Sequence, residues 1–89
     1  MPDARALAEA YGVRVEIADL GDWASVTLVA EYDPDGPVIR VSKRAAEDAV
    51  ERAIAHELYH HREAIGEVPR LRDRAARERA ADAFAERLA

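Results

Sequence analysis

The sequence predicts an α+β domain with one helix, then three strands, then two helices. Three features predict this class. Apolar and charged residues alternate early in the chain, as in strands. Later in the chain, apolar residues recur every three to four positions, as in helices. Gly, Pro and Asp lie between these segments, as in turns. No internal repeat or linker divides the chain, so we expect residues 1–89 to form one domain.

The first predicted element is a short helix over residues 2–11. Pro2 suits the start of a helix, and Gly12 suits its end. Apolar residues between them recur at helical spacing, namely Ala4, Leu7, Ala8 and Tyr11.

Residues 13–42 predict a small three-stranded sheet. Residues 13–18, VRVEIA, alternate apolar and charged side chains, as half-buried strands do. Two further strands are predicted near 23–32 and 37–42, where β-branched and aromatic residues are frequent. The turn sequence Asp-Pro-Asp-Gly-Pro between them predicts a hairpin.

Helical spacing begins after Ser42, which we expect to cap a helix over residues 44–65. Gly66 and Pro69 are expected to end that helix, and a last helix is predicted over residues 70–88. The apolar stripe of the first of these two helices consists of Val50, Ile54, Leu58 and Ile65.

Composition limits the chemistry that this chain can perform. Its 89 residues lie near the lower limit for a self-sufficient core, so a bound metal could add stability. Cysteine is absent, which excludes disulfides and thiolate ligands and leaves His, Asp and Glu as the strong metal ligands.

The charge pattern argues against nucleic acid as a partner. The formal net charge is -5, which repels phosphate backbones. One arginine cluster interleaves with Asp73 and Glu78 and is interpreted as a solvated helix face; it comprises Arg70, Arg72, Arg74, Arg77 and Arg79. No apolar run is long enough for a membrane span, and the N-terminal segment lacks the apolar stretch of a signal peptide, so we expect a cytoplasmic protein.

The candidate chemistry centres on the motif His56-Glu57-Leu58-Tyr59-His60. On a helix, residues four apart project from one face, so His56 and His60 can reach the same ion, with Glu57 beside them. Imidazole nitrogens suit zinc, and the small residues Ala49 and Ala53 on the same arc would let another helix approach.

The third ligand is predicted from the last helix. Glu78 lies near the middle of an apolar arc, where an unpaired carboxylate would be costly, and zinc would give it a partner. Arg74, four residues earlier, is the alternative partner. Asp82, one turn further on, could accept the second N–H of a ligand histidine and orient the ring.

These motifs resemble those of the gluzincin metallopeptidases. His56-Glu57-x-x-His60 followed by Glu78-x-x-Ala81-Asp82 is most similar to the minimal members, the minigluzincins and the ImmA/IrrE-like proteins. The resemblance also includes the strand GVRVEIADL, the hairpin ending VIRVS and the alanine before the motif, and so spans nearly the whole chain. The metzincin pattern is excluded because Glu63 and Gly66 occupy its glycine and third-histidine positions.

The resemblance implies zinc at His56, His60 and Glu78, with Glu57 as general base and acid and Asp82 behind a ligand histidine. It implies hydrolysis of peptide bonds by Glu57-assisted attack of zinc-bound water on an unstructured protein or peptide that pairs with a sheet edge. Larger gluzincins stabilise the oxyanion with a residue from a further helical subdomain, which we do not expect within these 89 residues. A shallow cleft on so small a domain leads to the hypothesis of weak or latent activity.

Some aromatic residues and His61 could contribute to the site or to packing. Candidates for the oxyanion-stabilising group, by residue type alone, are Tyr32, Tyr11 and His61. His61 is interpreted as a core-edge or surface histidine, and Tyr59 and Trp23 as packing residues.

Two other functions compete with a peptidase. One is a non-catalytic regulatory or peptide-binding module that contains the same zinc site, although a structural site would need no Glu57. The other is a helical interaction domain without metal, which zinc binding would exclude.

Overall fold

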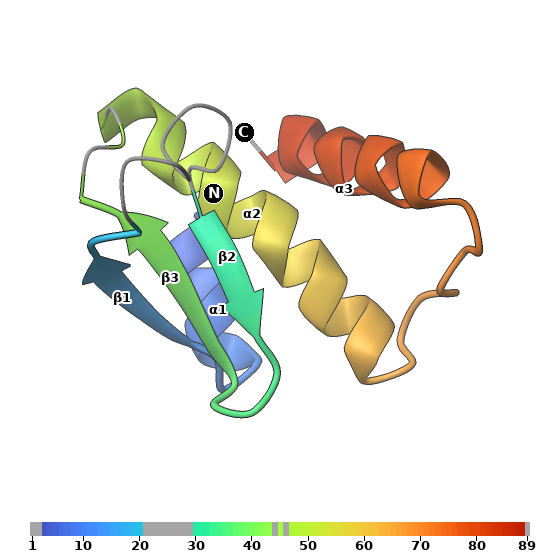
Figure 1. Ribbon diagram of the computed structural model, residues 1–89, viewed down its shortest axis with the longest axis horizontal. Helices are drawn as coiled ribbons and strands as arrows, with labels where there is room; N and C mark the ends of the chain where they lie inside the picture. The colour runs from blue at the N-terminus through green and yellow to red at the C-terminus, as the bar shows by residue number, and fades with distance from the viewer. Residues whose placement is uncertain (1–2, 21–29, 44, 46, 89) are drawn as a thin grey trace.

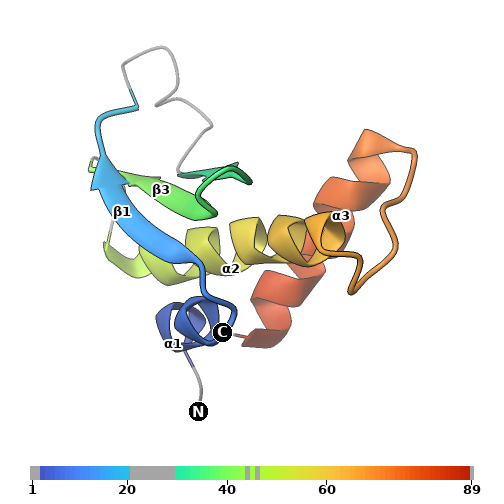
Figure 2. The ribbon, with the colours of Figure 1, turned by 90° about the horizontal axis from the view of Figure 1, so that it is seen from below.

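The computed structural model describes residues 3–20, 30–43, 45 and 47–88. Its elements follow the predicted order, which confirms the α+β class: α1 (Ala4–Ala10), β1 (Arg14–Ala18), β2 (Ala30–Asp33), β3 (Val38–Ser42), α2 (Glu47–Ala64) and α3 (Arg74–Leu88). The sheet lies along one side of α2, and α3 packs against α2 on another side (Figure 1). Viewed along the sheet, α2 runs between the strands and α1 (Figure 2).

The described sheet has β3 at its centre, in the order β1-β3-β2. β2 and β3 pair antiparallel, with Tyr32 opposite Ile39, which confirms the predicted hairpin. β1 pairs parallel to β3, with Val15 opposite the same Ile39. The predicted strand near 23–32 is described only from Ala30 onward; its earlier part lies outside the described residues.

Local interactions explain where α1 begins and ends. The carboxylate of Asp3 caps the helix by accepting a hydrogen bond from the backbone N–H of Ala6 at 2.7 Å. Glu51 of α2 accepts from the backbone N–H of Ala4 at 2.9 Å and so joins the start of α1 to α2. Gly12 has a φ of +74°, which suits glycine after a helix, as predicted. Pro2 lies outside the described residues.

Two predicted helix starts were wrong. Ser42 is the last residue of β3 and pairs with Ala18, so it cannot cap α2, which begins at Glu47. The last helix begins at Arg74 instead of residue 70, because Asp73 accepts a hydrogen bond from the backbone N–H of Ala75 at 3.2 Å and supplies the cap.

The core lies where β3 and α2 meet. Its largest fully buried side chains are Ile39, Ile54, Leu58, Val38 and Val41. Ile65, predicted on the apolar stripe of α2, is 54% exposed because the helix ends one residue before it. Leu71 is 42% exposed because it precedes α3. Packing of α2 against the sheet therefore fixes the middle of the helix, where the histidine motif lies.

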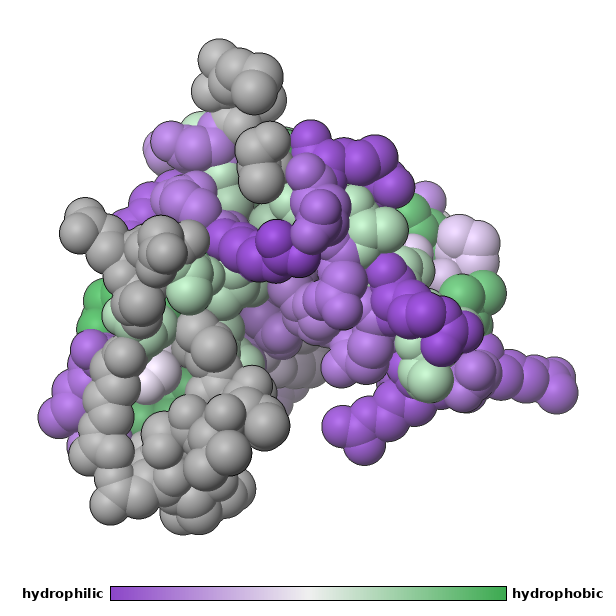
Figure 3. Space-filling model, turned by 90° about the horizontal axis from the view of Figure 1, so that it is seen from above, coloured by the Kyte–Doolittle hydropathy of each residue, from purple (hydrophilic) through white to green (hydrophobic). Residues whose placement is uncertain are grey.

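The surface agrees with the charged composition. Hydrophilic side chains cover much of the face drawn in Figure 3, and hydrophobic atoms are visible only in small areas. None of the described helices has the length and apolar character that a membrane crossing requires.

Candidate metal centre

α2 brings His56, Glu57 and His60 together on a face that is not used for the core. Leu58 and Ile54 are fully buried and fix the rotation of the helix, so the two histidines project toward α3. The two imidazole rings lie with their centres 5.1 Å apart. One ligand atom from each of the three motif residues lies within 4.8 Å of the others, a spacing at which they could hold a metal ion.

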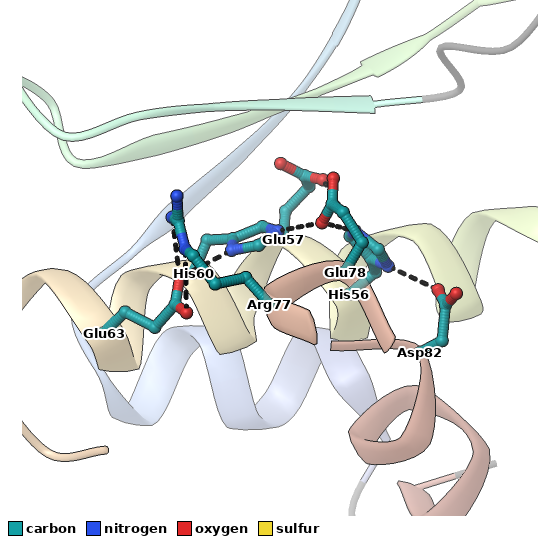
Figure 4. Close-up of polar contacts among 7 residues, drawn as sticks. All are labelled: His56, Glu57, His60, Glu63, Arg77, Glu78 and Asp82. Carbon is teal, nitrogen blue, oxygen red and sulfur yellow. Dashed lines mark hydrogen bonds and ion pairs between the residues drawn. The ribbon is translucent and has the colours of Figure 1, made fainter. Parts of the chain in front are cut away.

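Glu78 reaches this group from α3. Its Oε2 atom lies 3.2 Å from Nε2 of His56 and 2.9 Å from Nε2 of His60 (Figure 4). The helical wheel predicted Glu78 within an apolar face, but its side chain is 45% exposed, because α3 buries Ala81 and Ala85 and leaves Glu78 at the edge. The carboxylate nevertheless has two partners from α2, His56 and His60.

Each histidine also meets a carboxylate through its other ring nitrogen. Oδ1 of Asp82 lies 2.8 Å from Nδ1 of His56, the arrangement predicted for an orienting residue. Oε1 of Glu63 lies 2.7 Å from Nδ1 of His60. When each Nδ1–H donates to its carboxylate, both Nε2 atoms are left facing the same point.

Glu63 was not predicted as a site residue, and the predicted position of Arg77 was wrong. Arg77 was expected to lie on a solvated face, but its Nε and Nη2 donate to Glu63 at 3.2 and 3.0 Å, and Glu63 is almost fully buried. Burial alone would raise the pKa of Glu63, yet hydrogen bonds from Arg77 and His60 outweigh it and hold the pKa below its usual value. Glu63 lies seven residues after His56 and three after His60, a helical spacing that could have revealed it.

Glu57 stands beside the two histidines with a different electrostatic environment. Burial raises the pKa of its carboxyl from 4.5 to about 7; His56 opposes this shift, whereas the nearby Glu78 and Glu31 add to it. A carboxyl with a pKa near 7 can accept and return a proton close to neutral pH.

A cavity of about 350 Å³ opens next to these groups. Residues from β2, α2 and α3 line it, namely Tyr32, Glu57, His60, Arg74, Arg77 and Glu78. A small molecule or a short stretch of extended chain could therefore contact Glu57 and the histidine cluster from the side of the sheet.

The three candidates for oxyanion stabilisation differ in position. Tyr32 lines the cavity, and its hydroxyl lies 2.7 Å from Nδ1 of His61. His61 is 5% exposed and packs against Tyr32, which agrees with its interpretation as a core-edge histidine. Tyr11 donates its hydroxyl to Glu67 at 2.6 Å instead of facing the cavity.

Tyr59 and Trp23 were both predicted to be packing residues. Tyr59 contacts Phe84, with ring centres 5.9 Å apart, which agrees with a packing role. Trp23 lies outside the described residues.

The α+β fold and the histidine and glutamate cluster define a class of domain with the features of a small metallopeptidase. A family model described as "IrrE N-terminal-like domain", which is a peptidase family, matches residues 8–89. The chain belongs to this family, and membership implies metallopeptidase activity. No curated protein and no solved structure was found to match the chain.

Proposed function

We propose that the chain is a zinc-dependent metalloendopeptidase in which His56, His60 and Glu78 hold Zn²⁺ and Glu57 is the general base and acid. The observation that carries this proposal is the meeting of two imidazole Nε2 atoms and one carboxylate oxygen, contributed by two helices, beside a buried glutamate. Family membership supports the peptidase part of the proposal.

The donor set fits zinc. Two imidazole nitrogens and a carboxylate oxygen are a usual set for a catalytic zinc site, which keeps one position open. Ligand atoms in a tetrahedral zinc site lie about 3.3 Å apart. The separations of 3.2 and 2.9 Å from Glu78 Oε2 to the two histidines are close to that spacing.

Geometry favours Glu78 over Glu57 as the third ligand. Oε2 of Glu57 lies 3.9 Å from Nε2 of His56, whereas Oε2 of Glu78 lies nearer to both histidines. This leaves Glu57 free to handle protons. Asp82 is proposed to hold the ring of His56 through Nδ1.

The chain's own residues account for the proton transfers of peptide hydrolysis. Zinc, when bound, would supply Lewis-acid polarisation of the peptide carbonyl and lower the pKa of water. Glu57 accepts the proton that the attacking water loses and donates it to the leaving amine nitrogen. In the metal-free chain, burial raises the pKa of this carboxyl to about 7, so the group can hold or release a proton near neutral pH.

The proposed substrate is an unstructured protein or peptide. β2 is an edge strand of the described sheet, and its Tyr32 forms a wall of the cavity that contains Glu57. An extended peptide that pairs with β2 would run past Glu57. Weak or latent activity stays a prediction, based on the small size of this cleft.

The test is to measure zinc content and then the digestion of an unfolded protein. We expect one Zn²⁺ per chain and cleavage that a chelator stops and added zinc restores. Tight zinc binding without cleavage would instead support a non-catalytic peptide-binding module. A chain that takes up no zinc would refute both.

A further inference from the structure

The carboxylate of Glu63 uses both of its oxygens. Oε1 receives Nδ1–H of His60 at 2.7 Å and Nη2 of Arg77 at 3.0 Å, and Oε2 receives Nε of Arg77 at 3.2 Å. Figure 4 shows Glu63 below His60, with the guanidinium of Arg77 reaching it from α3. The three side chains form one continuous polar cluster that joins the two helices.

Burial makes this carboxylate a fixed acceptor. The side chain of Glu63 is 2% exposed, so losing a partner would leave a charge without solvent compensation. The planar guanidinium of Arg77 contacts both oxygens and limits rotation of the carboxylate. Asp82, the partner of His56, has a 62% exposed side chain, and no arginine among the described residues forms an ion pair with its carboxylate.

Arg77 is also the residue directly before Glu78. Its contact with Glu63 therefore ties α3 to α2 next to the glutamate whose Oε2 meets both histidines. This ion pair between a partly exposed arginine and a buried glutamate thus lies beside both His60 and Glu78.

We propose that Glu63 is a positioning residue for His60, and that the Glu63–Arg77 pair sets the relative placement of the two helices that contribute the metal ligands. This inference rests on the proposed zinc site. It adds Glu63 and Arg77, which would not bind the metal themselves but would position the proposed ligands on α2 and α3.

A double variant separates positioning from simple structural support. Glu63→Leu/Arg77→Met replaces the buried pair by apolar side chains of similar size, a change that often leaves stability unchanged or raised. We expect its zinc affinity, measured by competition with a chromogenic chelator, to fall about 10- to 100-fold while the fold is retained. Glu63→Gln, which keeps an acceptor but loses the charge that Arg77 binds, should lose less affinity.

The matched control is another ion pair between these helices, Arg52–Glu86, which lies on the surface. Glu86→Gln breaks that pair one helical turn from His56 and Asp82, and we expect its zinc affinity to stay within about twofold of the wild type. Equal zinc affinity in the wild type and in the folded double variant would overturn the inference.

Proton NMR of the zinc-loaded wild type tests the same proposal without a variant. The Nδ1 proton of His60, held by buried Glu63, should exchange with water more slowly than that of His56, held by exposed Asp82. Faster exchange at His60 would contradict the inference. A wild type that binds no zinc would refute the proposed function, whereas zinc binding with unchanged affinity in the double variant would refute only the positioning role.

Discussion

At the scale of single residues, Glu57 shows how position gives a common side chain an uncommon property. The residue follows His56 on α2, so it leaves the helix about 100° away and enters the partly closed space beside the cluster. Loss of hydration there disfavours its charged form and brings its pKa to about 7. A catalytic base works best with a pKa near the working pH.

The same property predicts a stability effect in the metal-free chain. Because the folded-state pKa of Glu57 is raised from 4.5 to about 7, its contribution to stability is present below 4.5 and is lost as pH rises through 7. Glu57→Gln, which never ionises, should therefore stabilise the metal-free chain at about pH 8 by on the order of 1–3 kcal/mol. Urea denaturation of both proteins at about pH 5 and pH 8 measures the difference, which must grow with pH.

Asp82 yields a second prediction at this scale. Asp82→Asn keeps the shape but weakens the acceptor for Nδ1 of His56, so zinc affinity should fall by roughly tenfold. The effect is expected at the small end of the range because Asp82 is well exposed. An affinity no lower than that of Glu86→Gln, a similar change on the same helix, would count against an orienting role.

At the scale of elements, hydrophobic spacing identified every described helix and strand but not all of their ends. The alternating sequence identified β1, although its apolar Ile17 is 59% exposed. β3 was identified by its β-branched residues and is buried on both faces except at Arg40. The helix starts failed, because Ser42 was needed in the sheet and Asp73 was a better placed cap. A residue that could cap a helix can instead pair in a sheet, and only the folded structure decides between the two roles.

Close approach of α2 and α3 depends on small side chains. Ala81 is fully buried one turn after Glu78, so Ala81→Leu should overpack the contact and lower stability by roughly 1–3 kcal/mol. It should also weaken zinc binding by moving Glu78 away from the histidines. The control is Ala83→Leu at an exposed position of the same helix, which should change neither.

At the scale of the whole molecule, helical spacing predicted that His56, His60 and Glu78 would meet, and the structure brings these three side chains together. Their role as zinc ligands stays a prediction. The spacing of Glu63 from both histidines could have revealed it, but its contact with Arg77 could not be predicted, because that contact depends on how α3 packs against α2. The parallel pairing of β1 with β3 could not be predicted either. Local sequence patterns predict the hairpin, but they do not show which of its two strands pairs with β1.

Zinc should stabilise a domain of this size measurably. A ligand that binds only the folded chain adds about 2.7 kcal/mol at one hundred times its Kd. For a domain of this length we therefore expect the melting temperature to rise by about 10 °C or more. Calorimetry with and without zinc measures the shift, and Glu78→Gln should greatly reduce it; an equal shift in that variant would remove Glu78 from the ligand set.

The central claim is that Glu57 performs proton transfer in zinc-dependent peptide hydrolysis. The most direct measurement compares digestion of one unfolded protein by zinc-loaded wild type and zinc-loaded Glu57→Gln at equal zinc content. We predict that the variant binds zinc but cleaves at least about 100-fold more slowly. Equal cleavage by the two zinc-loaded proteins would contradict the account.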